Sequence, residues 1–484
     1  MKIKMFQQVF DKKYFSNYLL LFILIIGIFF RFYNTPARYG FDFDPTRDAL
    51  VSVYGADHLQ FPLTGPKSGI GPFTFGPWYY YQIIVAKLLL PFDYAPWIYI
   101  GITSVVVIYV MYKVGEQLNG KKLGLIIGLL TALSPAELGP ITGLSNPNLI
   151  PIQAALCLYI FIHIVKKQPT IMLSFIWGIV LGIGINNHYQ MLGLLVLPVI
   201  GFLYKRVSIK IIIFFLIGMF IVFIPLIIFN LKTNFSTVDG IIFYLTKEKN
   251  AYYIPNSWSI YIRDFWPGFF SYVIGIPKNF GYFLLAYCLL VTAFLFRNKK
   301  VSAIYGLLFI GFLLNFFALR YFSGPRENYY FIYLHPFITI FVGWILWNSL
   351  QNILLRYFAL AISIGILFFV LQEDIRRLGS ESLYLRLYGQ ANYLIDHFPN
   401  KTFQIYQCGS KEKNRFQGIA FLLNTKNKLL DGGIKIGIKS DDCKSKDNTI
   451  YLPQADVVII NSVTKHNQDW SVVSPQSVYE NTVK

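Results

Sequence analysis

Long apolar runs separated by short polar connections fill most of this 484-residue chain. A helix needs roughly 17–25 predominantly apolar residues to cross ~30 Å of hydrocarbon, and many of the runs are close to that length. The pattern predicts about eleven membrane-spanning helices, at residues 15–33, 97–113, 123–137, 149–165, 171–186, 190–204, 209–230, 280–296, 302–320, 329–347 and 354–371.

One further run, P-W-Y-Y-Y-Q-I-I-V-A-K-L-L-L-P at 77–91, is ambiguous. It is short, lies between two prolines, is interrupted by Lys87 and opens with Trp78 and three tyrosines. Aromatic residues of this kind favour the membrane–water interface. We therefore expect a helix lying on the outer membrane surface, and a twelfth span is the alternative.

Basic residues gather in alternate connections between the apolar runs. They occur at 2–13, 113–122, 166–167, 205–210, 297–300 and 356. Short cytoplasmic loops carry this excess of lysine and arginine, so these connections and the N-terminus are predicted to be cytoplasmic. The outward-facing segments are then 34–96, 134–148, 186–189, 231–279, 321–328 and everything after about 372.

The composition changes after Gln372, where polar and charged residues return. Residues 380–398 are typical of an amphipathic helix, and the alternating stretches 403–408 and 455–460 predict strands. The sequence thus predicts a transmembrane module at 1–372 and a small extracytoplasmic α/β domain at 373–484. In an oxidising compartment Cys408 and Cys443 could pair there, and two unrelated free thiols are the alternative.

Overall composition agrees with a polytopic α-helical membrane protein. The chain is 55% hydrophobic and 14% charged, against about 25% charged residues in soluble domains. The net charge of +19 does not indicate nucleic-acid binding, because the basic residues lie in the short connections. The expected fold is all-α in the membrane, with a small α/β domain outside.

An acidic stretch, G-F-D-F-D-P-T-R-D-A-L at 40–50, follows the first apolar run. Asp44 before Pro45 has the pattern of a helix N-cap with proline at the first helical position, and Asp48 follows one turn later. Capping explains one aspartate and not three. The loop that begins here, 34–96, is long enough to be a functional surface. A carboxylate partly shielded from water there could act as a general base on a hydroxyl.

Other polar residues lie on the predicted outer connections. They are Glu137, Asn146, Asn148, His188, Arg320 and Arg326. Arginines on the outer side run against the charge bias, and a phosphate-bearing lipid is a natural partner for them. Pairing with Glu327 or plain solvation is the alternative for the arginines. The alternative for His188 is an ordinary polar residue at a helix end.

These features together resemble the GT-C membrane glycosyltransferases, most closely the protein O-mannosyltransferase and lipid A aminoarabinose transferase group. D-P-T-R-D-A-L at 44–50 resembles the family's acidic motif, although Pro45 replaces the usual glutamate. F-G-P-W-Y-Y-Y at 75–81 resembles its proline–aromatic turn without the leading basic residue. S-N-P-N-L-I-P at 145–151 resembles a region where some members have an aspartate, and asparagines stand there in this chain.

The resemblance implies inverting sugar transfer from a polyprenyl-phosphate donor to a hydroxyl of a protein, lipid or glycan acceptor. The reaction would take place at the outer face of a bacterial plasma membrane, with Asp44 as the general base. The residues expected to bind substrate are Arg47, Asp48, Asn146, Asn148, His188 and Arg326. Asp42, Asp44 and Asp48 could also hold Mg²⁺ or Mn²⁺ with a phosphate, and metal-free transfer is the alternative.

Two other classes of protein compete with this interpretation. A transporter or flippase of lipid-linked sugars would use the same arginines for phosphate and would need no base. Transporters place ionisable groups at the middle of the membrane, however, whereas here nearly all lie at the ends of spans. A non-catalytic scaffold for an envelope complex would leave the acidic stretch unexplained.

Overall fold

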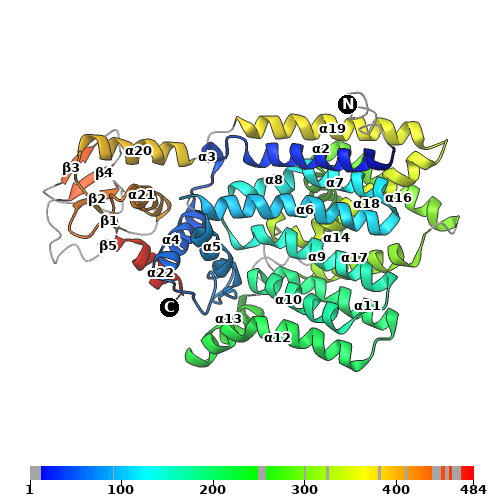
Figure 1. Ribbon diagram of the computed structural model, residues 1–484, viewed down its shortest axis with the longest axis horizontal. Coiled ribbons are helices and arrows are strands. Elements are labelled where there is room, and N and C mark those ends of the chain that lie inside the picture. The colour runs from blue at the N-terminus through cyan, green and yellow to red at the C-terminus, as the bar shows by residue number, and fades with distance from the viewer. Residues whose placement is uncertain are drawn as a thin grey trace, which may run out of the picture.

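The structure is a computed structural model. It describes residues 12–90, 92–248, 258–298, 301–322, 326–379, 383–408, 413–438, 449–452, 457–460 and 470–483. A large bundle of helices carries a small unit of helices and strands at one end (Figure 1).

Each of the predicted spans forms a helix. The helices are α2 (Lys12–Phe32), α6 (Ala95–Asn119), α7 (Lys121–Leu133), α9 (Ile150–Lys166), α10 (Ile171–Asn187), η2 (Tyr189–Leu195) with α11 (Val196–Lys205), α12 (Ile209–Lys232), α16 (Lys278–Arg297), α17 (Ala303–Arg320), η5 (Asn328–Leu334) with α18 (His335–Gln351), and α19 (Arg356–Leu378). Within the described ranges, eight helices are long and apolar enough to cross a membrane, and a bent pair makes a ninth. Two shorter apolar helices, Ile171–Asn187 and Tyr189–Lys205, complete the predicted set. The chain is a polytopic integral membrane protein.

The bent pair lies where a continuous span was expected at 123–137. Helix α7 ends at Leu133, and α8 (Pro135–Thr142) continues at an angle of 46°. Pro135 begins α8 at a position where its missing N–H costs nothing. The Ser134 hydroxyl donates to the carbonyl of Val273 over 2.6 Å. This bond fixes the break against α15 (Trp266–Ile274).

The basic connections meet at one end of the bundle. Gly120, with φ of 85°, turns the chain tightly from α6 into α7, a conformation that suits glycine. The Lys166 ammonium donates to the carbonyls of Gln117 and Leu118, and that of Lys121 donates to Asn17. Two connections predicted to lie on the same side are therefore in contact, and the start of α2 lies beside them.

The long connections hold further short helices. They are α3 (Thr35–Arg38), α4 (Phe43–Asp57), α5 (Trp78–Leu89), η1 (Asn146–Leu149), α13 (Ser236–Phe243), η3 (Tyr244–Glu248), α14 (Trp258–Ile260) and η4 (Tyr261–Phe265). The 12 residues of α5 extend only about 18 Å, well short of ~30 Å of hydrocarbon. Among the described residues α5 is not one of the helices long and apolar enough to cross a membrane, and its position on the membrane surface stays a prediction.

The C-terminal unit combines helices with one mixed sheet. Its elements are α20 (Leu383–His397), β1 (Phe403–Cys408), α21 (Lys413–Thr425), β2 (Ile434–Ile438), β3 (Thr449–Leu452), β4 (Val457–Ile460), β5 (Trp470–Val473) and α22 (Pro475–Val483). The strand order is β3-β4-β2-β1-β5, with β1 and β2 parallel and the other pairs antiparallel.

The predicted features of this unit can be located in the structure. Strand 403–408 is present as β1, and β4 forms at the end of the stretch predicted at 455–460. The predicted domain boundary at 372 falls inside α19, which continues to Leu378. The proposed pairing of Cys408 with Cys443 concerns a residue outside the described ranges.

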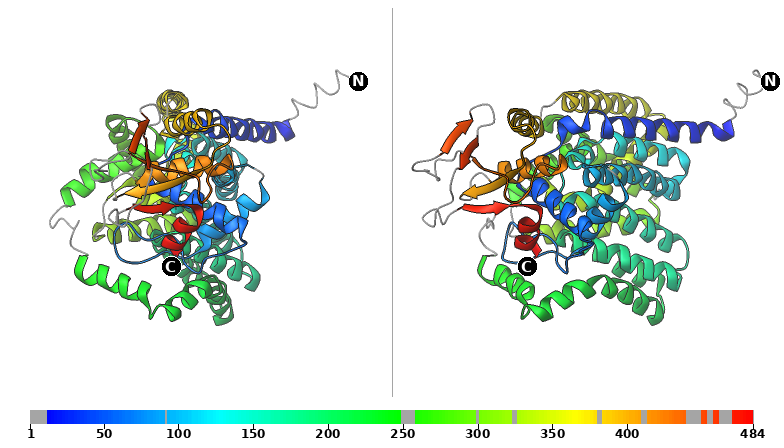
Figure 2. Two further views of the ribbon diagram at one scale, coloured as in Figure 1. Left: turned by 90° about the vertical axis from the view of Figure 1, so that its left-hand side faces the viewer. Right: turned by 60° about the vertical axis from the view of Figure 1, so that its left-hand side comes forward.

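One hydrophobic core joins the C-terminal unit to the outer helices of the bundle. Phe41 stacks on Trp97 with ring centroids 5.5 Å apart, and Phe421 of α21 packs against both rings. Tyr94 and Tyr384 join their hydroxyl groups across the same junction. Helix α4 consequently lies between the bundle and the C-terminal unit, with α21 and α22 beside it (Figures 1 and 2).

Candidate active site

The acidic stretch forms the first two turns of α4. The helix begins at Phe43, with Asp42 as the extended N-cap residue, and no side chain caps it by a hydrogen bond. The prediction that Asp44 is the N-cap was therefore wrong, because the helix starts earlier. Pro45 is tolerated in the first turn, where its N–H would have no helical partner. The Asp44 side chain is 56% exposed and lies where the helix dipole favours negative charge.

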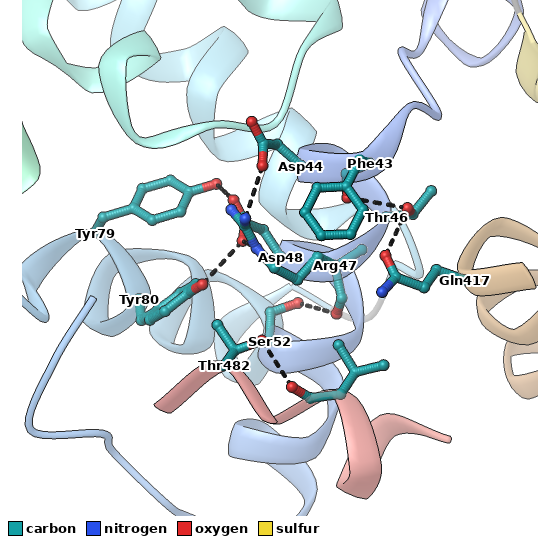
Figure 3. A network of polar contacts seen from close by, with 12 residues as sticks. Phe43, Asp44, Thr46, Arg47, Asp48, Ser52, Tyr79, Tyr80, Gln417 and Thr482 are labelled. Atoms are coloured by element: carbon teal, nitrogen blue, oxygen red, sulfur yellow. Dashed lines mark hydrogen bonds and ion pairs between the residues drawn. The ribbon is translucent and has the colours of Figure 1, made fainter. Parts of the chain in front are cut away.

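Arg47 connects an exposed aspartate to a buried one. Its Nη1 lies 2.7 Å from Asp44 Oδ1, and its Nε lies 2.7 Å from Asp48 Oδ1. The Asp48 carboxylate is fully buried and also accepts hydrogen bonds from the Tyr79 and Tyr80 hydroxyls, at 2.9 and 3.0 Å. Both tyrosines reach it from α5 (Figure 3). Both carboxylate oxygens of Asp48 thus have partners.

Burial has the largest influence on the protonation states of Asp48, Tyr79 and Tyr80. It raises the pKa of Asp48 to about 6, although Arg47 and the Tyr79 hydroxyl favour the charged form. Burial, followed by the nearby Asp48 charge, raises the pKa of Tyr79 and of Tyr80. At neutral pH the tyrosines therefore donate and Asp48 is mainly a carboxylate, which gives Arg47 a fixed position.

The C-terminal unit holds α4 from the opposite side. The Thr46 hydroxyl lies 3.4 Å from Gln417 Oε1 of α21, and Tyr54 packs on Tyr479 of α22 with centroids 4.8 Å apart. Tyr79, Tyr80 and Gln417, which help to position Arg47 and α4, were missed from the sequence. Tyr79 and Tyr80 lie in a motif interpreted as interfacial aromatics, and nothing in the sequence marks Gln417.

The predicted residues Asn146 and Asn148 make contacts within the chain. Asn146 Nδ2 donates to the carbonyl of Asn187 over 2.6 Å. Asn148 Nδ2 donates to the carbonyls of Pro140 and Gly143 over 2.9 and 2.8 Å, which uses both of its amide hydrogens. These bonds order the connections that follow α8 and α10.

His188 lies in the same region, in the connection after α10. Its ring stacks on Phe75 at 4.6 Å, and its Nδ1 accepts from the backbone N–H of Gln190. Burial lowers the pKa of His188 to about 3. The imidazole is therefore neutral at physiological pH and offers a hydrogen bond rather than a charge.

Arg326 lies beside aromatic side chains from the long connection at residues 231–279. Its guanidinium is 5.0 Å from the ring centroid of Tyr261 and donates to the carbonyl of Arg320. Burial lowers the pKa of Arg326, and the neighbouring Arg320 acts in the same direction. Within the described ranges no hydrogen bond or ion pair joins Arg326 to α4. We call Arg326 and its neighbour Arg320 the arginine group and describe it separately from the residues on α4.

An apolar cavity of about 350 Å³ lies beside the arginine group. Helices α15, α16, α17 and α18 contribute its walls, including Trp266, Phe270, Leu289, Phe312 and Trp344. Trp266 packs against Tyr261, and the Arg326 guanidinium lies over the Tyr261 ring. Cationic groups therefore stand close to one wall of a cavity lined by hydrocarbon.

The three aspartates proposed as metal ligands do not converge. Asp48 faces Arg47 and the two tyrosines, whereas Asp42 and Asp44 are exposed at the start of α4. Burial, and then the charge of Asp44, raises the pKa of Asp42. Over the described ranges no group of three or more histidine, cysteine or acidic side chains could hold a metal ion.

No family model matches the sequence, and no curated protein matches it. Solved structures match the fold. ArnT from Cupriavidus metallidurans, bound to undecaprenyl phosphate, gives a TM-score of 0.60 at 11% identity over 89% of this chain and 94% of that chain. The apo oligosaccharyltransferase of Archaeoglobus fulgidus gives a TM-score of 0.53 at 12% identity over 85% of this chain and 64% of that chain.

A third match is AglB from Archaeoglobus fulgidus in complex with an inhibitory peptide and a dolichol-phosphate. Its TM-score is 0.52 at 12% identity, over 81% of this chain and 59% of that chain. The present chain thus spans less than two thirds of the archaeal oligosaccharyltransferase. Both ArnT and AglB are GT-C glycosyltransferases, and this chain shares their fold, as the motifs after its first span predicted.

Proposed function

We propose that this protein transfers a sugar from a polyprenyl-phosphate donor to a hydroxyl group of an acceptor. The observation that carries the proposal is the arrangement on α4. An exposed carboxylate, Asp44, is held in place by Arg47, which is itself anchored on the buried Asp48. Such an arrangement presents a base that is accessible to substrate and fixed in geometry.

In the proposed step, Asp44 takes the proton of the acceptor hydroxyl. The acceptor oxygen then forms a bond to the anomeric carbon, and the bond from that carbon to the phosphate oxygen breaks. The lipid phosphate leaves with the bonding electron pair, and attack from the opposite face inverts the anomeric centre. Asp48 touches no substrate and acts as a positioning residue for Arg47.

The donor is assigned to the arginine group. Arg326 binds the phosphate, since guanidinium groups bind phosphate oxygens through paired hydrogen bonds. The isoprenoid chain occupies the adjacent apolar cavity between α15 and α18. The undecaprenyl phosphate named for ArnT and the dolichol-phosphate named for AglB support this class of donor.

The remaining predicted residues have supporting roles in this proposal. Asn146 and Asn148 order the connections that follow α8 and α10. The neutral imidazole of His188 forms a hydrogen bond with the substrate. The proposed Mg²⁺ or Mn²⁺ site is not used in this reaction, because the three aspartates do not converge and a metal-bound Asp44 could not take the acceptor proton. A structure of the archaeal oligosaccharyltransferase with Zn and sulfate supports testing for such a metal.

The active side is assigned to the outer face of a bacterial plasma membrane. The contacts among the basic connections support this orientation, because those connections lie at one end of the bundle and α4 lies at the other (Figure 1). The C-terminal unit would then be extracytoplasmic.

Transfer by reconstituted protein from a panel of polyprenyl-phosphate sugars tests the proposal. Asp44→Asn should reduce the rate by at least about 100-fold, the usual contribution of a general base. Asp57→Asn is the matched control, because Asp57 is exposed at the far end of the same helix. A near-normal rate for Asp44→Asn would remove the base assignment. Movement of intact donor across the vesicle membrane without any transfer would instead identify a flippase.

A further inference from the structure

A second polar cavity lies apart from α4, between the end of α2, α8 and the end of α19. Its volume is about 260 Å³. The lining residues are Phe30, Arg38, Leu138, Thr142, Asp374, Arg376 and Arg377. The proposed transfer reaction uses none of them.

Asp374 is the residue that calls for an explanation. Its side chain is only 1% exposed, and neither carboxylate oxygen has a hydrogen-bond partner among the described residues. Burying a polar group without a hydrogen bond is costly, and a buried charge is normally paired. A hydrogen-bond donor from outside the chain would satisfy both oxygens.

Arginine side chains surround the same cavity. The buried Arg38 donates from Nη2 to the carbonyls of Tyr33 and Phe30, while its Nε has no partner within the described ranges. Arg376 and Arg377 both bond to a single carboxylate, that of Glu373, at 2.8 Å. Three arginines, Arg38, Arg376 and Arg377, stand against two acids, Glu373 and Asp374, so the cavity and its rim carry excess positive charge.

The cavity is open to the surface on the arginine side. The Arg376 side chain is 71% exposed, whereas Asp374 lies at the buried end. A fitting ligand thus needs a donor group that reaches Asp374 and an anionic group that stays among the arginines. Phosphoethanolamine has this arrangement, with three N–H donors on its ammonium group and a phosphate close by. A choline headgroup has no N–H to donate, and a purely anionic headgroup leaves Asp374 without a partner.

The surroundings indicate that the headgroup belongs to a membrane lipid. Helices α2 and α19 both pack on α7 and α8. Both helices expose large apolar side chains, among them Phe22, Ile25 and Phe29 on α2 and Ile364, Phe368 and Ile375 on α19. Acyl chains can therefore lie against these helices while the headgroup enters the cavity.

We propose that this cavity binds the headgroup of a phosphatidylethanolamine-type lipid. Its ammonium group bonds to Asp374, and its phosphate bonds to Arg38 and Arg376. The proposal does not depend on the transfer reaction, although the site lies near the base of α4. Arg38 stands only a few residues before Asp42, and the carbonyl of Thr142 in the cavity wall accepts from the Gly40 N–H over 2.6 Å.

Native mass spectrometry of the purified full chain, with added phosphatidylethanolamine, phosphatidylcholine or phosphatidylglycerol, tests the assignment. Wild-type protein should retain phosphatidylethanolamine about tenfold better than either other lipid, the ratio expected for one hydrogen bond to a charged group. Asp374→Asn should remove most of that preference. Asp239→Asn, an exposed acid on α13, should leave it unchanged.

A second measurement uses only the wild-type protein. Retention should fall stepwise as the headgroup nitrogen is methylated, since each methyl group removes one donor. Equal retention across that series would overturn the proposal. So would a preference for phosphatidylglycerol that Asp374→Asn strengthens, which would indicate a simple anion site. Displacement of the lipid by an equimolar amount of glycerophosphoethanolamine would exclude a membrane lipid as the occupant.

Discussion

Two buried aspartates near the same end of the molecule have opposite surroundings. Asp48 on α4 is fully buried and bonds to Arg47, Tyr79 and Tyr80. Asp374 on α19 is nearly as buried and has arginines around it, yet no described residue bonds to its oxygens.

The difference distinguishes a carboxylate that stabilises the fold from a carboxylate that is available to bind a ligand. Burying a carboxylate costs several kcal/mol after relaxation, and only well-placed partners offset that cost. At Asp48 the chain supplies these partners, so the residue fixes the position of Arg47. At Asp374 no described residue donates a hydrogen bond, so this part of the cost stays until a ligand arrives. Mutation should therefore affect the two residues in opposite directions.

The largest expected effect is on stability. Asp48→Asn removes one partner of a buried ion pair, a change that typically costs about 3–5 kcal/mol. Asp374→Asn removes, at similar volume, a buried charge whose oxygens accept no hydrogen bond from a described residue, so it should leave stability equal or slightly higher in lipid-free detergent. Thermal unfolding of both variants and the wild type in the same detergent measures the contrast. Similar losses of stability for both variants would show that Asp374 already has a stabilising partner.

Features set by residues close together in the sequence could be predicted, whereas contacts between residues far apart in the sequence could not. The spans followed from the lengths of apolar runs, and the proximity of Asp44, Arg47 and Asp48 followed from their spacing on one helix. The two tyrosine bonds to Asp48 join residues 31 and 32 positions apart, and no local pattern encodes such a contact.

The contrast between the two aspartates was also invisible in the sequence. Asp374 stands in Q-E-D-I-R-R, which reads as an exposed, salt-bridged helix end. Glu373 does form such bridges, but Asp374 faces the interior because α8 and α3 close over it. Packing between elements distant in sequence decides which of two adjacent acids is buried.

The next effect concerns pH. Since burial raises the pKa of Asp48 to about 6, this residue is mainly charged at pH 7 and mainly neutral at pH 5. Below pH 6 it loses the charge that fixes Arg47, so the transfer rate should fall as the pH decreases through about 6. A pH–rate profile at saturating donor measures this acidic limb. A flat rate down to pH 5 would show that the ionisation of Asp48 does not matter for transfer.

The smallest effect should come from single donors to Asp48. Tyr79→Phe removes the hydroxyl bonded to Oδ2, a bond that favours the charged carboxylate and so lowers its pKa. Its loss should move the acidic limb upward by about one pH unit, since a hydrogen bond to a charged group contributes roughly 1.5 kcal/mol. The rate well above the limb should change little.

Tyr81→Phe is the matched control, because Tyr81 lies on the same helix and packs on Phe61 and Trp78 rather than on Asp48. An acidic limb that moves in Tyr79→Phe and stays in Tyr81→Phe would assign the titration to Asp48. A limb that moves in neither variant would assign it to another acid on α4. In that case Asp48 would be a structural charge alone, and the pH dependence of transfer would have to arise at the exposed carboxylates.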